Sequence, residues 1–481
     1  MQKNQNWTGD NGTDYGLETR THDTKIAYDE SSHLIEQSSY RYSLQERATP
    51  NLYRLLYDYQ SVPKVSFNHR FVPVNMPEHI WITDTTFRDG QQAQAPFTVK
   101  QITDLFTMLH RLGGPNGMIR QSEFFVYSKK DRDALAACQD LGYDFPEITT
   151  WIRAASKDFQ LVKSLGVRET GVLVSCSDYH IYNKMGLTRA TALDRYLGVV
   201  KEILSLGISP RCHFEDITRA DFYGFVVPFA EALQELSDES GIPIKIRACD
   251  TMGYGVSYPG AALPRSVPGI VYGLNHYAGI PSEMLEWHGH NDFYKAVTNS
   301  STAWLYGCSS VNCALLGIGE RCGNTPLEAM VMEYASLRGT TSGMDTTVIT
   351  EIAEYFEKEI GCEIPPRTPF VGRDFNITRA GIHADGLMKD EEIYNIFNTE
   401  KLLNRPAQVA VSATSGQAGI AHWLAHRCPD KGADQYDKRS PVVAKMKELV
   451  DAEYEAGRTT TMSDRELTFM FRRAKEELGI R

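Results

Sequence analysis

The feature that most constrains the fold of this chain is a regular alternation of short β-branched runs and longer helical patterns between about residues 80 and 339. Eight segments have the length and composition of buried strands: 79–86, 122–127, 148–153, 171–176, 211–216, 244–250, 285–290 and 309–317. Helical patterns follow them at 99–111, 132–141, 158–165, 190–206, 222–240, 260–277, 294–306 and 327–337. Eight successive strand-helix units predict an α/β fold, a closed (β/α)8 TIM barrel over residues 80–339. A doubly wound sheet is the alternative, but it would not require eight units.

Residues 1–79 precede the predicted barrel. Residues 1–30 are rich in Asn, Thr, Asp and Gly, which is typical of a flexible arm or of a segment that wraps around a partner. Thr49 followed by Pro50 is typical of a helix start, and the apolar residues of 52–59 follow with helical spacing. We therefore expect an N-terminal arm and a short amphipathic helix in front of the barrel.

Residues 340–481 lose the strand signal and predict a mostly helical C-terminal appendage. Ser463 and Glu466 have the spacing of a capping box at the start of the last helix. Ser440 followed by Pro441 marks the start of the helix before it.

Charge and composition exclude several classes of function. The chain has 50 Lys and Arg residues against 61 Asp and Glu, a formal net charge of −11, which opposes binding to nucleic-acid phosphates. No stretch approaches the roughly 18 continuous apolar residues needed to cross a bilayer, and residues 1–10 are polar rather than signal-like. We expect a soluble, cytoplasmic protein whose partners are small molecules, not nucleic acid or membrane.

The nine cysteines indicate neither a disulfide framework nor a zinc knuckle, because their number is odd and no CxxC pair occurs. Several lie within apolar segments, where we expect small core residues: Cys176, Cys212, Cys249, Cys308 and Cys313.

The end of the seventh predicted strand has the pattern of a metal site. His288 and His290 are two residues apart, so in a strand they point to the same face, at the barrel end where chemistry is expected. Two imidazoles at this position predict a divalent cation, which also needs an oxygen ligand. The first strand offers Asp84 and Asp89; Asp89 lies at its end and is favoured, whereas Asp84 lies deeper and is interpreted as a buried structural carboxylate.

Other predicted strands also end in polar residues, which include Glu123, Arg153, His180, Glu215, Asp216, Asp250, Thr251 and residues 320–324. Each is as compatible with a fold-supporting hydrogen bond as with a substrate contact. Residues 317–323 are glycine-rich but lack the GxGxxG spacing and a Walker lysine, so nucleotide binding is not predicted.

With the motifs at 84–92, 288–292 and 319–324, the chain resembles the metal-dependent barrels that catalyse Claisen condensations of acyl-CoA. This family includes isopropylmalate, homocitrate and citramalate synthases and, as a lyase relative, hydroxymethylglutaryl-CoA lyase. The likeness covers roughly residues 80–394. It implies an acyltransferase that uses a divalent metal, Mn²⁺, Mg²⁺, Co²⁺ or Zn²⁺, and that works as a homodimer.

The resemblance also implies roles for individual residues. The metal ligands are Asp89, His288 and His290, together with Asn324, which is a ligand in the lyase branch of the family. The catalytic residues are Arg88, Glu215 and, from a post-barrel segment that reaches into the partner subunit's site, His383 and Tyr394. The substrate-binding residues are Gln92, Glu123, Arg153 and Thr251, with Arg153 binding the distal carboxylate of a diacid. Glu215 and His383 remain alternatives for the base.

The choice of 2-oxo acid follows from departures within the family. The bulky Phe293-Tyr294-Lys295 and a second strand without a glycine-proline turn argue against a branched acid, and the tail is too short for a leucine-sensing domain. The residues at 87–92, 123–125, 177–180 and 287–290 are most similar to the citrate-forming branch. This similarity implies condensation of acetyl-CoA with oxaloacetate and thioester hydrolysis to citrate and CoA, a reaction of the tricarboxylic acid cycle. The alternatives are homocitrate, isopropylmalate or citramalate synthesis and, more distantly, a non-catalytic barrel.

Overall fold

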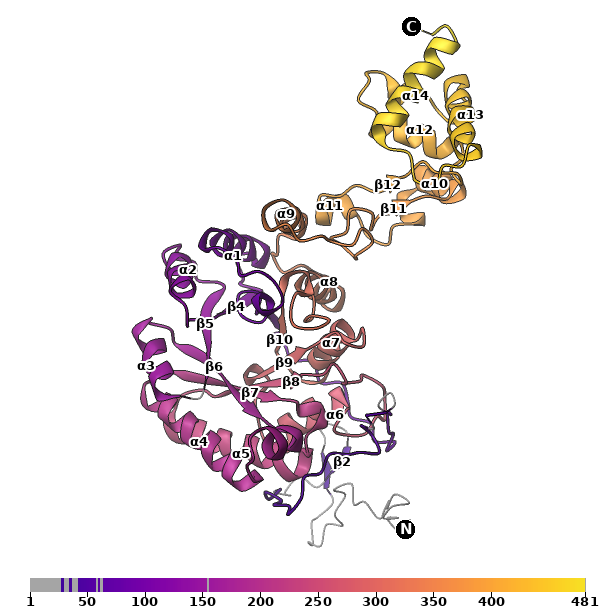
Figure 1. Cartoon of the computed structure of the whole chain (residues 1–481). Coiled ribbons are helices and arrows are strands. Elements are labelled where there is room, and N and C mark those ends of the chain that lie inside the picture. The colour runs from indigo at the N-terminus through magenta and orange to yellow at the C-terminus, as the bar shows by residue number, and fades with distance from the viewer. Residues whose placement is uncertain are drawn as a thin grey trace. The chain divides into compact units, whose positions relative to one another are not determined.

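Figure 1 shows the protein, a computed structural model that describes residues 27–29, 34–36, 42–57, 59–60, 64–153 and 155–480. Eight parallel strands close into a barrel in the order β10, β3, β4, β5, β6, β7, β8, β9. Their bounds are β3 (Trp81–Asp84), β4 (Ile119–Phe124), β5 (Glu147–Ile152), β6 (Glu169–Ser175), β7 (Ser209–Glu215), β8 (Lys245–Asp250), β9 (Leu285–Gly289) and β10 (Ser310–Cys313). The predicted TIM barrel is therefore confirmed.

Eight helices alternate with the strands: α1 (Val99–Gly113), α2 (Lys129–Gln139), α3 (Ser156–Ser164), α4 (Arg189–Ser205), α5 (Val227–Ser240), α6 (Val267–His276), α7 (Ala296–Tyr306) and α8 (Leu327–Arg338). The predicted helix over 260–277 starts too early, because α6 begins at Val267. The side chain of Ser266 caps this helix by accepting a hydrogen bond from the Gly269 N–H. The predicted eighth strand is too long, because Leu316 has a left-handed φ of 55° that ends the extended run.

The second barrel strand lies three residues earlier than the sequence pattern predicts. It spans Ile119–Phe124 instead of 122–127, and it pairs with β5 through Glu123 and Phe124. Glu123 is therefore the last residue but one of the strand, next to its carboxyl end, and its side chain is only 1% exposed. This places a carboxylate within the barrel.

The segment before the barrel is not helical as predicted. Tyr53 has a left-handed φ of 46°, which an α-helix cannot continue, and residues 54–57 form turns. Backbone hydrogen bonds attach the segment to the barrel's outer elements, from Gln45 N to Gly224 O (3.0 Å) and from Asn75 N to Leu305 O (2.8 Å). Of the predicted arm at 1–30, only β1 (Ala27–Asp29) is described, and it pairs with β2 (Leu34–Glu36); the remainder lies outside the described residues.

The chain divides into two compact units after Met344. The second unit contains α9 (Val348–Tyr355), α10 (Gly381–Lys389), α11 (Thr399–Leu403), α12 (Gln417–His426), α13 (Pro441–Glu455), α14 (Asp464–Glu477) and the parallel pair β11 (Ile377–Thr378) and β12 (Gln408–Val409). Ser440 caps α13, and Ser463 forms the predicted capping box with Glu466 on α14. Trp423, Val442 and Phe471 belong to the core between these last helices.

The five cysteines expected in the core are all buried. No helix in the described part of the chain has both the length and the apolar character that a membrane crossing requires.

Glu328, in the first turn of α8, is a buried carboxylic acid whose titration should limit stability. Burial raises the pKa of Glu328 from 4.5 to about 7, and its carboxylate accepts a hydrogen bond from Leu316 N (3.0 Å). Because the folded pKa lies above the unfolded one, the protonated form favours folding; this stability is present below pH 4.5 and is lost as the pH rises through 7.

Glu328→Gln stays neutral at every pH and keeps an acceptor for Leu316 N. The change in the free energy of unfolding that it causes should therefore be more favourable at pH 8 than at pH 4.5, by about 3 kcal/mol. Calorimetric melting of both proteins at the two pH values measures this difference. An equal shift at both pH values would contradict the assignment.

Candidate metal centre and active site

Asp89, His288 and His290 form a buried cluster at the carboxyl end of the barrel. Their ligating atoms all lie within 4.8 Å of one another. The His288 Nε2 and His290 Nε2 atoms are 3.2 Å apart and lie 3.9 and 3.8 Å from Asp89 Oδ2. A point equidistant from these three atoms, in their common plane, lies about 2.1 Å from each. This is a normal bond length from a divalent cation to nitrogen or oxygen. The three residues thus fit a divalent metal.

The unsatisfied atoms of the site support the same conclusion. Among the described residues, Asp89 Oδ2 and Asn324 Oδ1 are buried without a hydrogen-bond partner. Such atoms are rare in folded proteins unless an ion or water satisfies them. The backbone of Asn324 pairs with that of His290, which brings the two residues together. The side-chain Oδ1 of Asn324 is therefore a candidate for a fourth ligand. Gly319 leaves room for this side chain, because a Cβ there would lie 2.3 Å from Asn324 Nδ2.

Hydrogen bonds behind the ligands hold them in a binding-competent form. Asn312 on β10 accepts a hydrogen bond from His288 Nδ1 (2.8 Å), a tautomer assignment that leaves Nε2 free to bind metal. Asn312 in turn donates to Thr83 Oγ1 (3.0 Å), and Thr83 donates to Glu286. Residues on three neighbouring strands thus orient one imidazole.

Electrostatics keep the ligands in the protonation states that a metal needs. Burial would raise the pKa of Asp89, but Arg88 and the two histidines lower it to about 2. Burial and the neighbouring His290 lower the pKa of His288 to about 3, so both the carboxylate and the imidazole are unprotonated at neutral pH.

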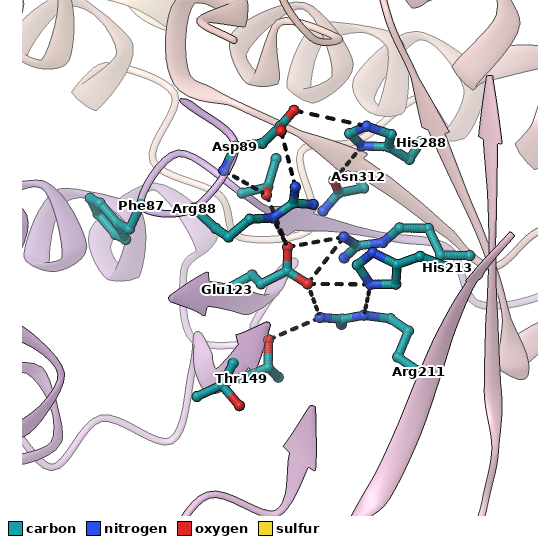
Figure 2. Close-up of polar contacts among 12 residues, drawn as sticks. Phe87, Arg88, Asp89, Glu123, Thr149, Arg211, His213, His288 and Asn312 are labelled. Carbon is teal, nitrogen blue, oxygen red and sulfur yellow. Dashed lines mark hydrogen bonds and ion pairs between the residues drawn. The ribbon is translucent and has the colours of Figure 1, made fainter. Parts of the chain in front are cut away.

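Arg88 is fixed between the metal cluster and a buried carboxylate (Figure 2). Its Nη1 donates to Asp89 Oδ1 (3.0 Å) and its Nε donates to Glu123 Oε2 (2.6 Å). Burial would raise the pKa of Glu123, but Arg247, Arg88 and Arg211 hold it well below its usual value. The family resemblance predicts that Glu123 binds substrate; in the structure its carboxylate contacts three guanidinium groups, those of Arg88, Arg211 and Arg247.

Sequence reasoning missed the charged residues inside the barrel. Arg211, Arg247 and Glu286 are at most 2% exposed, and all three belong to one network around Glu123. A signal was present: Arg211, His213 and Glu215 alternate on β7 as Glu286 and His288 do on β9, which places each set on one face. These residues were not predicted, because only polar residues at the ends of the strands were considered as site candidates.

Glu215 and Thr251 lie at the ends of β7 and β8, as predicted. Glu215 contacts His180 Nδ1 (3.0 Å) and accepts from Ser175, and Thr251 Oγ1 accepts from Asp216 N (2.8 Å). Burial would raise the pKa of Glu215, but its hydrogen bond with His180 contributes most to lowering it below the usual value.

The remaining predicted residues of the barrel lie toward its rim. Gln92 follows the metal ligand in the short helix Gly90–Ala93 and is exposed. Arg153, just after β5, is 60% exposed; its Nε donates to Asp158 (3.2 Å) and its guanidinium lies over the Tyr127 ring. Asp84, 1% exposed, accepts hydrogen bonds from Thr86 and Ser122 and does not belong to the metal cluster, which agrees with the predicted structural role.

His383 and Tyr394 come together in the second unit. His383 is on α10, and its ring centroid is 4.5 Å from that of Tyr394. Gly386 permits this approach, because a Cβ there would lie 2.5 Å from the Tyr394 ring. Both rings are exposed, and large apolar side chains beside them are exposed too, Ile382 by 77% and Ile396 by 98%.

A TIM barrel with an Asp-His-His cluster and an adjacent buried arginine defines a metal-dependent barrel enzyme. The model of the HMGL-like family matches residues 79–356, more than half of the chain, and the protein belongs to this family. Within it, the chain is similar to two proteins named citrate (Re)-synthase. That of Clostridium kluyveri is 54% identical over 444 residues, 92% of this chain and 98% of that protein. That of Syntrophus aciditrophicus is 56% identical over 439 residues, 91% of this chain and 70% of that protein.

A more distant relative is the 2-phosphinomethylmalate synthase of Streptomyces hygroscopicus. It is 35% identical over 432 residues, 88% of this chain and 96% of that protein. The citrate-forming branch that the sequence motifs indicate is therefore confirmed as the more similar one.

Proposed function

We propose that the protein is a metal-dependent citrate (Re)-synthase, which condenses acetyl-CoA with oxaloacetate and hydrolyses the thioester to give citrate and CoA. The observation that carries this function is the 54% identity over 98% of the Clostridium kluyveri enzyme. The buried set of Arg88, Asp89, His288 and His290 supports catalysis, because a barrel that only bound a partner would not need it.

Asp89, His288 and His290, with Asn324 as a further ligand, would hold the divalent ion. When bound, this ion supplies Lewis acidity to the carbonyl of the 2-oxo acid. Arg88 faces the same region, and Glu123 fixes its guanidinium at 2.6 Å. A cation held in this way stabilises the negative charge that develops on the oxo oxygen without reorganising during the reaction. Gln92 and Thr251 are further candidates for contacts with the substrate.

A base must remove a proton from the methyl group of acetyl-CoA, so that the resulting carbon nucleophile attacks the oxo carbon. Glu215 is one candidate, but a carboxylate whose pKa is lowered by its contact with His180 is a weak base. We therefore favour His383, with Tyr394 beside it, as the acid-base pair. Water then attacks the thioester carbonyl, the C–S bond breaks, and CoA leaves as the thiol.

His383 and Tyr394 act, in this proposal, in the barrel of a second copy of the chain. The exposed Ile382 and Ile396 beside them support it, because apolar surface of this kind is commonly buried at an interface. We infer a homodimer that works in the cytoplasm and supplies the tricarboxylic acid cycle. The N-terminal residues 1–79, the barrel 80–339 and the helical part 340–481 are the three functional segments of this proposal.

An assay of CoA release with a panel of 2-oxo acids tests the function. Oxaloacetate should give the greatest kcat/KM, and the activity should disappear when the metal is removed and return when it is restored. Greater activity with 2-oxoglutarate, 2-oxoisovalerate or pyruvate would replace citrate synthesis by homocitrate, isopropylmalate or citramalate synthesis. No CoA release with any acid by the metal-loaded protein would favour a non-catalytic barrel.

A further inference from the structure

Below the metal ligands in the barrel lies the guanidinium of Arg247, one of whose nitrogens has no hydrogen-bond partner among the described residues. Arg247 on β8 is fully buried; its Nε donates to Glu286, and its Nη1 lies 3.1 Å from both oxygens of Glu123. Its Nη2 is buried and has no hydrogen-bond partner among the residues that the structure describes. A buried, charged N–H group without an acceptor is costly, so this atom is suited to bind an anionic group.

The register of the barrel places Arg247 directly beneath the metal ligands. On the paired strands β8 and β9, Arg247 is opposite Glu286, and Cys249 is opposite His288. Because side chains on one face of a strand are two residues apart, Arg247 lies one inward-facing layer below His288. Its partner Glu123 also holds Arg88, which contacts Asp89. Its other partner Glu286 is linked to His288 through Thr83 and Asn312. Contacts therefore connect Arg247 to the metal cluster along two paths.

We propose that the free Nη2 of Arg247 binds the second carboxylate of the 2-oxo acid and so selects a diacid over a monoacid. This inference rests on the proposed function and names the residue that determines its substrate. A guanidinium held by Glu123 and Glu286 is already oriented, so little freedom is lost when the carboxylate binds. The family resemblance implies that Arg153 makes this contact instead, but the Arg153 side chain is exposed and paired with Asp158.

Binding of malate and lactate to the metal-loaded enzyme, measured by calorimetry without acetyl-CoA, tests the inference. The two 2-hydroxy acids share the head that binds a metal, but lactate lacks the second carboxylate. Arg247→Lys should weaken malate binding by roughly 30-fold or more and change lactate binding by less than about threefold. Equal weakening of both ligands, or of neither, would overturn the inference.

Matched variants separate the role of Arg247 from the general effect of changing a buried arginine. Arg189→Lys changes another fully buried arginine, held by Asp178 and Asp221, and should leave the malate-to-lactate ratio unchanged. If Arg247→Lys does not fold, the neutral pair Arg247→Gln with Glu286→Gln removes one charge of each sign and should lose the preference for malate in the same way. Collapse of the ratio in Arg153→Gln, with the ratio kept when Arg247 is replaced, would assign the contact to Arg153. The panel of 2-oxo acids on the unmodified enzyme tests the proposed function separately.

Discussion

Replacement of His290 by Ala is expected to abolish turnover and to remove the metal from the purified protein. His290 supplies one of three protein atoms that lie 3.2 to 3.9 Å apart, and the two that remain cannot hold a labile divalent ion. Loss of the Lewis acid should lower kcat/KM by roughly a thousandfold or more. His288→Ala should behave in the same way. Metal analysis and the CoA-release assay on the same preparations measure both effects.

Asp84→Asn is the matched control for this experiment. Asp84 is a buried carboxylate near the metal cluster, but it accepts hydrogen bonds from Thr86 and Ser122, and burial raises its pKa to about 6. The variant should keep its metal, and any loss should appear in thermal stability instead. Full metal content in His290→Ala, or an empty site in a folded Asp84→Asn protein, would reverse the assignment of the two aspartates.

The metal site could be predicted from sequence because its ligands lie at positions that the barrel itself determines. His288 and His290 share a face by the two-residue period of a strand, and Asp89 follows the carboxyl end of the first strand, which β10 separates from β9. Strand ends come together in every parallel barrel, so residues far apart in the chain could be assigned to one site from the order of the strands alone.

The buried network could not be predicted in the same way. The partners of Arg247 depend on the register between strands. The predicted second strand, at 122–127, placed Glu123 near its start, whereas β4 has Glu123 next to its carboxyl end.

The wrongly predicted helix before the barrel has a different cause. Its apolar spacing is helical, but Tyr53 has a left-handed conformation, and the two residues before it form hydrogen bonds with the barrel: Asn51 N donates to Asp178 Oδ2 (2.8 Å), and Leu52 O accepts from Tyr179 Oη (3.0 Å). Tertiary contacts here outweigh local propensity.

The position of His383 in the second unit leads to the last prediction. If His383 serves the barrel of a partner subunit, then His290→Ala and His383→Ala should each be nearly inactive alone, and yet they should restore activity when co-expressed. In a mixed dimer, one barrel has an intact His290 and receives an intact His383 from the other chain. The second site of the same dimer carries both substitutions.

Random pairing makes half of the dimers mixed, each with one good site of two, so activity should reach about a quarter of the unmodified level. Differently tagged subunits, purified over both tags, isolate the mixed dimer, whose activity should reach about half. If His383 served its own chain, neither site of a mixed dimer would be complete, because each barrel would lack one of the two histidines. A purified mixed dimer without activity would therefore rule out the shared site. Only an active His383→Ala variant would return the role of the base to Glu215, whose lowered pKa would then have to rise when the substrates bind.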